Sequence, residues 1–145
     1  MLEKKFVKTR FLNKIFVSGK KHKSESDLLK CFKSLQRSQK MKCSREIFKL
    51  SLKNSSPFFQ LKSVKSKTRK NLMQIPYLLN EDLRVFYGIK NLLKSSNLFK
   101  KKAFHLRLYE ELLKSSNYKG QSVKNKKKLH ENAFLQRKFA RYRWF

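Results

Sequence analysis

The stretch Pro57–Pro76, PFFQLKSVKSKTRKNLMQIP, interrupts a chain whose remaining apolar periodicity is helical. It holds two short apolar runs, one beginning at Phe58 and one ending at Ile75, and a polar, strongly basic segment separates them. Two such runs around a turn are typical of a β-hairpin. Two isolated strands are only marginally stable in water. The sequence therefore predicts a hairpin arm over about 58–76 with a basic tip, mobile unless it packs against another element.

Three helices are predicted before the arm from apolar residues at helical spacing. The first covers 4–18, and Gly19 follows it, where a left-handed residue suits a helix C-terminus. The second begins with Ser24 as its N-cap, a residue type that often caps helix N-termini. The third begins with Ser44 as N-cap and ends by Pro57, since proline cannot continue a helix.

Three more helices are predicted after the arm. Asn80 caps the fourth, and two acidic residues follow it, where negative charge suits the helix dipole. The fifth is centred on residues 108–113, and the last runs from about Ser122 to Phe139. The sequence thus predicts a mainly α fold, a single domain over 1–145 in which six helices carry a protruding two-stranded β-hairpin between the third and the fourth.

The net charge limits the classes of partner. Lysine and arginine number 38 against 9 acidic residues, which gives a net charge of +29. A charge this high repels itself unless a polyanion compensates it, and the plausible polyanions are nucleic acid, an anionic membrane surface and an acidic protein. No run approaches the roughly 18 apolar residues that a spanning helix needs, and the cations are not confined to one amphipathic face. We therefore expect a nucleic acid partner and no membrane partner.

The sequence holds no pattern that indicates catalysis or a bound cofactor. The nine acidic residues are thinly spread, and no pair suggests a general acid and base. Cys31 and Cys43 have no CxxC partner and no zinc-like spacing to histidines, so we interpret them as small hydrophobic residues. His130 has no nearby acid or nucleophile and is interpreted as a packed or solvated helix residue. We expect no enzymatic activity, cofactor, metal or small-molecule substrate; a ribonuclease would need a carboxylate or histidine pair.

The last stretch, Lys124–Phe145, reads KNKKKLHENAFLQRKFARYRWF. It opens with a basic run and ends, over about 138–145, with cations that alternate with large rings. Cations suit phosphates, and rings can stack on bases or pack at a junction. Both roles remain open for Trp144 near the end of this tail.

Four segments of the chain match one known family in order. They are LNKIFVSGKK at Leu12–Lys21, the Gln74-Ile75-Pro76 end of the hairpin with the helix after it, Tyr109–Leu113 continuing to Gly120, and Lys138–Trp144 preceded by His130 and Ala133. The final run, KFARYRW, is close to the family ending Phe-Ala-His-Tyr-Arg-Trp and is the most specific signal. On these segments the chain resembles ribosomal protein seven of the small subunit, of the bacterial and organellar type.

The resemblance implies both an architecture and a role. Members of this family have six helices with a β-ribbon between the third and the fourth. They bind the 3′ major domain of small-subunit rRNA directly and early, and they nucleate assembly of the head of the subunit. Their ribbon reaches towards the exit site, close to mRNA and tRNA, and their last helix meets a neighbouring ribosomal protein. The resemblance thus implies a structural constituent of the small ribosomal subunit with these partners.

The composition suggests where such a ribosome resides. Lysine and phenylalanine are abundant and glycine is rare, which is typical of proteins from AT-rich genomes, as organellar genomes often are. A mitochondrial ribosome is the expected location, with a plastid ribosome as the alternative.

The chain departs from the family pattern at three places. The hairpin of the family carries Arg-Arg followed by Gly-Gly, whereas the tip here, Lys67–Lys70, has no glycine. The tryptophan of the fourth helix is Asn91, and the usual Ala-Glu-Ala-Asn of the last helix is Ala133–Gln136. The extra apolar bulk of Phe134 and Leu135 predicts an altered protein neighbour.

The expected RNA contacts are basic side chains that neutralise phosphates and release counterions. Specificity would come from RNA shape and splayed bases, because side chains cannot read the deep groove of an A-form helix. The candidates are Lys14, Lys20, Lys21 and Lys23 at the end of the first helix, Lys65, Lys67, Arg69 and Lys70 on the ribbon, and Lys124, Lys126, Arg141, Arg143 and Trp144 late in the chain. The alternative function is a generic basic nucleic-acid-binding or interaction protein without a ribosomal role, which would show no preference for structured RNA.

Overall fold

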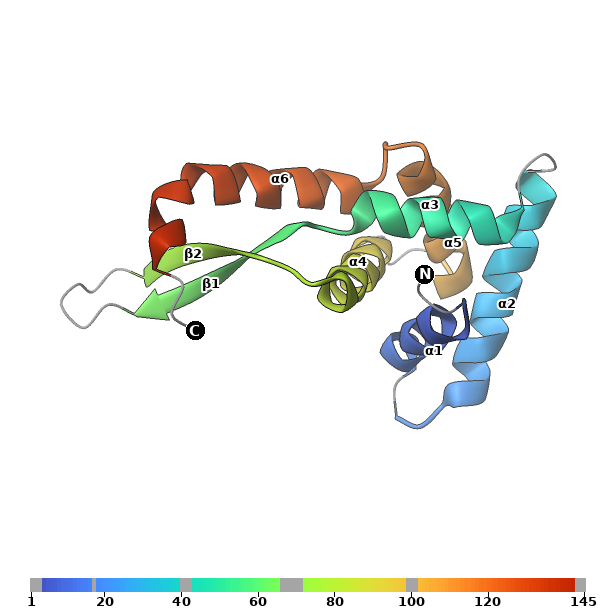
Figure 1. Cartoon of the computed structure of the whole chain (residues 1–145). Helices are drawn as coiled ribbons and strands as arrows, with labels where there is room; N and C mark the ends of the chain where they lie inside the picture. Colours follow the sequence, from blue (N-terminus) through green and yellow to red (C-terminus); the bar gives the residue numbers. More distant parts are fainter. Residues whose placement is uncertain (1–3, 17, 40–42, 66–71, 99–101, 143–145) are drawn as a thin grey trace.

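A computed structural model of the chain describes residues 4–16, 18–39, 43–65, 72–98 and 102–142, and Figure 1 shows its elements. In chain order they are α1 (Lys4–Ile15), α2 (Lys21–Ser38), α3 (Ser44–Ser55), β1 (Phe59–Lys65), β2 (Leu72–Leu78), α4 (Glu81–Ser96), α5 (Phe104–Ser116), α6 (Gln121–Leu135) and a short 3₁₀ helix, η1 (Arg137–Arg141). The predicted fold is confirmed, since six α-helices flank a hairpin between the third and the fourth.

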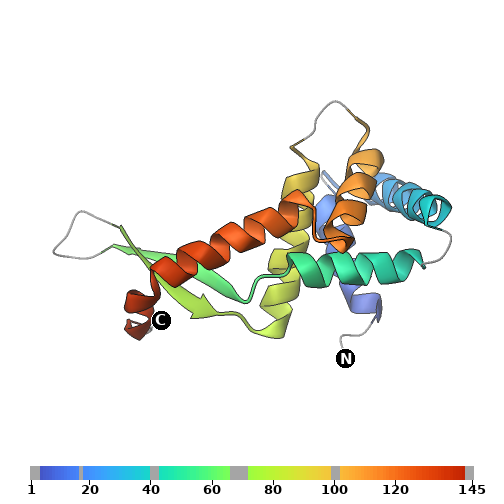
Figure 2. The same cartoon turned by 90° about the horizontal axis from the view of Figure 1, so that it is seen from above.

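The molecule consists of a helical body and an arm. Helices α1 to α5 pack together, and α6 leaves this body and runs beside the hairpin in both views (Figures 1 and 2). β1 packs against α6, and β2 packs against η1. The base of the arm is therefore held by the C-terminal part of the chain, which meets the condition under which two strands become stable.

One hydrophobic core joins the first five helices. The rings of Phe11 on α1 and Phe32 on α2 meet that of Phe48 on α3 edge to face, with centroid distances of 5.2 and 5.7 Å. The buried members of this core are Phe11, Leu12, Leu28, Cys31, Leu35, Ile47, Phe48, Leu52, Val85, Ile89, Leu92, Leu108 and Leu112. None of these buried residues comes from α6 or the strands, so the position of the arm depends on contacts outside the main core.

The hairpin is antiparallel and extends further on its return strand than the sequence indicated. Phe59 pairs with Leu78, and Lys65 pairs with Leu72. Pro76 lies inside β2 opposite Leu61, so the predicted end of the arm at Pro76 was two residues short. Proline is tolerated here because each strand of a two-stranded sheet has one edge that needs no hydrogen-bond partner.

The turn between α1 and α2 comes earlier in the chain than predicted, since the first helix was expected to reach residue 18. α1 ends at Ile15, and α2 begins at Lys21 with Lys20 at the N-cap position. Gly19 does adopt a left-handed conformation, with φ of +72°, and Ser18 has φ of +54°. These two residues reverse the chain early, so the predicted N-cap at Ser24 was wrong. Ser24 lies inside the helix, and its buried hydroxyl donates to the carbonyl of Lys20.

Other helix ends agree with the sequence to within a few residues. Asn80 holds the N-cap position of α4 as predicted, whereas Cys43 rather than Ser44 precedes α3. α6 ends at Leu135 and not at Phe139, because the chain tightens into the 3₁₀ helix η1. This change of direction brings η1 onto β2.

Candidate nucleic-acid interface

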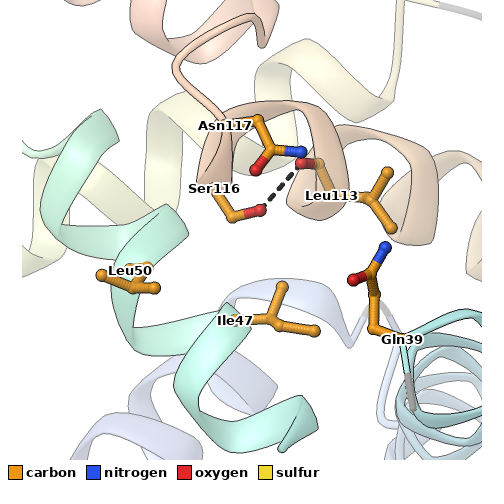
Figure 3. Close-up of a pocket in the computed structure, with 6 residues that line it drawn as sticks. All are labelled: Gln39, Ile47, Leu50, Leu113, Ser116 and Asn117. Atoms are coloured by element: carbon orange, nitrogen blue, oxygen red, sulfur yellow. Dashed lines mark hydrogen bonds between the residues drawn. The ribbon is translucent and has the colours of Figure 1, made fainter. Parts of the chain in front are cut away.

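Two hollows on the described surface differ in size: the volume is about 30 Å³ in one and about 350 Å³ in the other, which is more open. A pocket of about 30 Å³ between the N-terminal half of α3 and the end of α5 holds water at most (Figure 3). Its lining residues are Gln39, Ile47, Leu50, Leu113, Ser116 and Asn117. A shallower depression follows the outer face of α2 alone and is lined by His22, Glu25, Ser26, Leu29, Lys30 and Lys33.

The described residues form neither a metal-binding cluster nor a membrane-spanning helix. They contain no group of three histidine, cysteine or acidic side chains placed to hold a metal ion. No helix within them is long and apolar enough to cross a membrane. Of the two cysteines, Cys31 is buried in the core as interpreted, whereas Cys43 is exposed.

The first group of predicted RNA contacts lies at the α1–α2 turn. Lys14 is in the last turn of α1, and its Nζ lies 4.6 Å from the ring centroid of Phe86 on α4. Lys20, Lys21 and Lys23 are all exposed. The structure does not place Lys20 and Lys21 at the C-terminal end of α1, as the sequence indicated. They start α2, whose first turn has no acidic residue, so cations lie at the positive end of a helix dipole.

The predicted RNA contacts on the ribbon and those late in the chain are only partly described. Lys65 is the last residue of β1, whereas Lys67, Arg69 and Lys70 of the tip lie outside the described residues, as do Arg143 and Trp144. Lys124 is exposed on the first turn of α6, and Arg141 is exposed at the end of η1. Because η1 packs on β2, the structure brings Arg141 to the arm. Figure 1 shows that the α1–α2 turn is well apart from the arm.

A histidine on α6 links that helix to the start of the arm. The N–H of Phe58, one residue before β1, donates to Nε2 of His130 at 3.1 Å. The rings of Phe58 and Phe59 pack against the imidazole, with centroid distances of 6.0 and 5.7 Å. Burial lowers the pKa of His130, and the charge of Lys126 lowers it further. The imidazole is therefore neutral near pH 7, as an acceptor at Nε2 must be.

Two cations also contact the ring of Phe58. The guanidinium of Arg84, near the start of α4, is 4.1 Å from the ring centroid, and Nζ of Lys126 on α6 is 5.5 Å from it. Lys126 also donates to the carbonyl of Asn54 in the last turn of α3 at 3.1 Å. Burial lowers the pKa of Lys126, and the charge of Arg84 adds to this effect. The sequence singled out Lys126 but not Arg84, because one cation near a helix start carries no local signal.

A buried glutamate on α5 sets where α6 begins. Oε1 of Glu111 accepts hydrogen bonds from the backbone N–H of Ser122 at 2.8 Å and from its hydroxyl at 2.7 Å. The carboxylate thus caps the positive end of α6. Gly120 makes the approach possible, because a Cβ there would lie 2.8 Å from the same Oε1 and 2.9 Å from the backbone of Ser115. The direction of α6, and with it the position of Lys126, depends on this contact.

The comparison with known proteins covers the helical body, the arm and α6 together. The family model Ribosomal protein S7p/S5e matches residues 2–137. Similar relatives are the small ribosomal subunit proteins uS7 of Listeria welshimeri, Listeria monocytogenes and Listeria innocua. Each is 30% identical over 136 residues, which cover 94% of this chain and 85% of the relative. The chain therefore belongs to the family Ribosomal protein S7p/S5e.

Proposed function

We propose that this chain is a structural component of the small ribosomal subunit, where it binds the 3′ major domain of the rRNA and nucleates assembly of the head. The observation that carries the proposal is the family match over residues 2–137 in a chain with a net charge of +29. The role of the family is structural and not enzymatic, in agreement with the sequence prediction. A compact domain of this charge is suited to RNA because counterion release drives phosphate binding.

The α1–α2 turn is proposed as one rRNA contact. Lys20 and Lys21 lie at a helix N-terminus that carries no acidic residue in its first turn, an arrangement that is unfavourable for the free protein. An RNA phosphate there would interact with the lysines and with the positive end of the helix dipole. Lys14 and Lys23 extend the same basic surface.

The arm and the tail are proposed as the second contact region. It comprises Lys65, Lys67, Arg69 and Lys70 of the ribbon and Lys124, Lys126, Arg141, Arg143 and Trp144. The packing of η1 on β2 supports a single region, since it brings the tail to the arm. The tip of the ribbon would extend towards mRNA and exit-site tRNA.

The end of α6 is proposed as a contact with a neighbouring ribosomal protein. Phe134 and Leu135 are 63% and 73% exposed, although both are large apolar residues. The guanidinium of Arg137 lies 4.5 Å from the ring centroid of Phe134. An apolar and cationic surface of this kind would suit a partner that covers the rings and offers acidic groups at the edge.

A mitochondrial ribosome is the proposed location, with a plastid ribosome as the alternative. The support is compositional, namely abundant lysine and phenylalanine with only 3 glycines. The listeria relatives are bacterial proteins, and they are 30% identical to this chain.

The test is sedimentation of tagged protein from its native cells through a high-salt sucrose gradient, with sequencing of the bound RNA. We expect small-subunit rRNA enriched in the 3′ domain, whose sequence would also identify the organelle. The generic basic protein of the alternative reading would carry mixed RNA or DNA that is lost as salt rises.

The tip is tested by replacing Lys67, Arg69 and Lys70 together with alanine. The fold should persist, while RNA protection near the arm should weaken. The matched control replaces three exposed lysines outside the proposed contacts, Lys30, Lys33 and Lys49, and so removes the same charge. Equal protection by the tip variant and the control would refute a tip contact.

A further inference from the structure

Basic side chains converge at the base of the arm, and no acidic side chain in the described part of the chain forms an ion pair with them. Arg84 on α4 and Lys126 on α6 lie at the ring of Phe58, beside His130. The ion pairs among the described residues are Arg10–Asp82, Lys102–Glu110 and Lys114–Glu110, and none involves this cluster. Charges of the same sign are therefore held together at the point where the arm leaves the body.

One donor group in this cluster also remains unused. Nε of Arg84 is buried and has no hydrogen-bond partner in the described part of the chain. A buried donor without a partner is costly, and more so when the group is charged. Lys126 is half-buried and has its pKa lowered by burial and by the charge of Arg84. An anion beside the two cations would offset the burial and the mutual repulsion of their charges.

The site can be reached from the surface. Phe58 is 46% exposed, and Arg84 and Lys126 are each partly exposed. A guanidinium binds a phosphate through paired N–H groups, and an ammonium adds a point charge. These features suit an anion that is part of a large molecule and approaches from one side.

We propose that the base of the arm is a phosphate-binding site, in which Arg84 and Lys126 hold one backbone phosphate of the RNA above the ring of Phe58. This inference rests on the proposed function, because it takes rRNA as the source of the phosphate. His130 is a positioning residue that acts through its hydrogen bond to the N–H of Phe58.

Binding at this site would orient the arm. Phe58 immediately precedes β1, and its carbonyl accepts the N–H of Leu79 at 3.0 Å just after β2. This bond closes the base of the hairpin. A phosphate held by the two cations at the ring of Phe58 therefore fixes both strands relative to the helical body.

The experiment measures filter binding of the full chain to a transcript of the 3′ major domain of small-subunit rRNA over a series of salt concentrations. Arg84→Gln and Lys126→Gln should each reduce the magnitude of the log–log salt slope by about 0.7 to 0.9, the share of one phosphate. In the double variant, the slope should decrease by less than the sum of the two single decreases, because both cations hold the same phosphate. Lys128→Gln, an exposed residue of α6, is the matched control.

Charge-preserving variants separate binding from folding. Arg84→Lys and Lys126→Arg should keep the slope of the wild type, and circular dichroism should be unchanged in all variants. In ethylation interference, one phosphate should matter to the wild type and not to the double variant that lacks both cations.

The outcomes distinguish this inference from the proposed function. The phosphate site would be overturned if Arg84→Gln and Lys126→Gln had the same salt slope as Lys128→Gln. It would also be overturned if the charge-preserving variants bound RNA as poorly as the glutamine variants. A wild type that binds a 5′-domain transcript equally well would count against the proposed function alone, because the salt slopes on that transcript would still reveal the site.

Discussion

Two neighbouring glutamates on α5 should differ sharply in their contribution to stability, and the one with more ion pairs should matter less. Glu110 pairs with Lys102 and Lys114, and 35% of its side chain is exposed. Glu111 is 4% exposed and forms no ion pair in the described residues, but it accepts both hydrogen bonds from Ser122. Replacing each glutamate with alanine separates the contribution of the exposed ion pairs from that of the buried hydrogen bonds.

The size of the difference follows from these surroundings. Glu111→Ala removes two hydrogen bonds to a charged group, each of which contributes about 1.5–3 kcal/mol. Both bonds share one oxygen, so the lower end applies and the free energy of unfolding should fall by about 3 kcal/mol. Glu110→Ala removes ion pairs that reach solvent, which contribute about 0–1 kcal/mol. At about 2–4 °C per kcal/mol, Tm should fall by about 6–12 °C for Glu111→Ala and by less than about 4 °C for Glu110→Ala.

The assays are urea denaturation and thermal denaturation of the full chain, both followed by circular dichroism, at an ionic strength that screens the net charge. Glu111→Gln keeps a carbonyl oxygen as acceptor, so its loss should lie between those of the two alanine variants. Equal losses for Glu110→Ala and Glu111→Ala, or a larger loss for Glu110→Ala, would refute the argument that the buried carboxylate anchors α6.

Three further outcomes can be measured on the isolated chain. Because the pKa of His130 in the folded protein lies below its ordinary value of 6.5, the unfolded state binds more protons below that pH. The free energy of unfolding should then decrease as pH falls below 6.5, and His130→Gln should flatten this decrease; parallel pH profiles would contradict it. Gly120→Ala should cost about 1–3 kcal/mol in urea denaturation through overpacking against Glu111, and a neutral result would show that the contact can relax. Burial raises the pKa of the Cys31 thiol to about 12 and Cys43 is exposed, so a thiol reagent should titrate one cysteine in the native protein and two in denaturant.

Elements with a local signal were predicted well. The six helices follow from apolar residues at helical spacing, and the arm follows from two short apolar runs around a basic segment. Asn80 marks the start of α4 in both the sequence and the structure. The start of α2 was missed because it depends on the left-handed pair Ser18 and Gly19, whose chain reversal Ser24 does not reveal.

The candidate interface was only partly visible in the sequence. Basic residues could be assigned to the arm, the tail and the first helix end, because charge is a property of each residue. The cluster at the base of the arm was not visible, since Phe58 and His130 lie 72 positions apart. Arg84 joins them from a third element, and no spacing rule connects such residues.

The sequence by itself determined the order of helices and strands, the polyanionic class of the partner and, through its motifs, the family. These properties depend on neighbouring residues or on composition. Only the tertiary structure decided the direction of α6, the docking of η1 on β2 and the convergence of Arg84, Lys126 and His130 on Phe58. The physical reason is that helix periodicity arises within a few residues, whereas these contacts form only after the core of α1 to α5 and the cap at Glu111 have set the path of the chain.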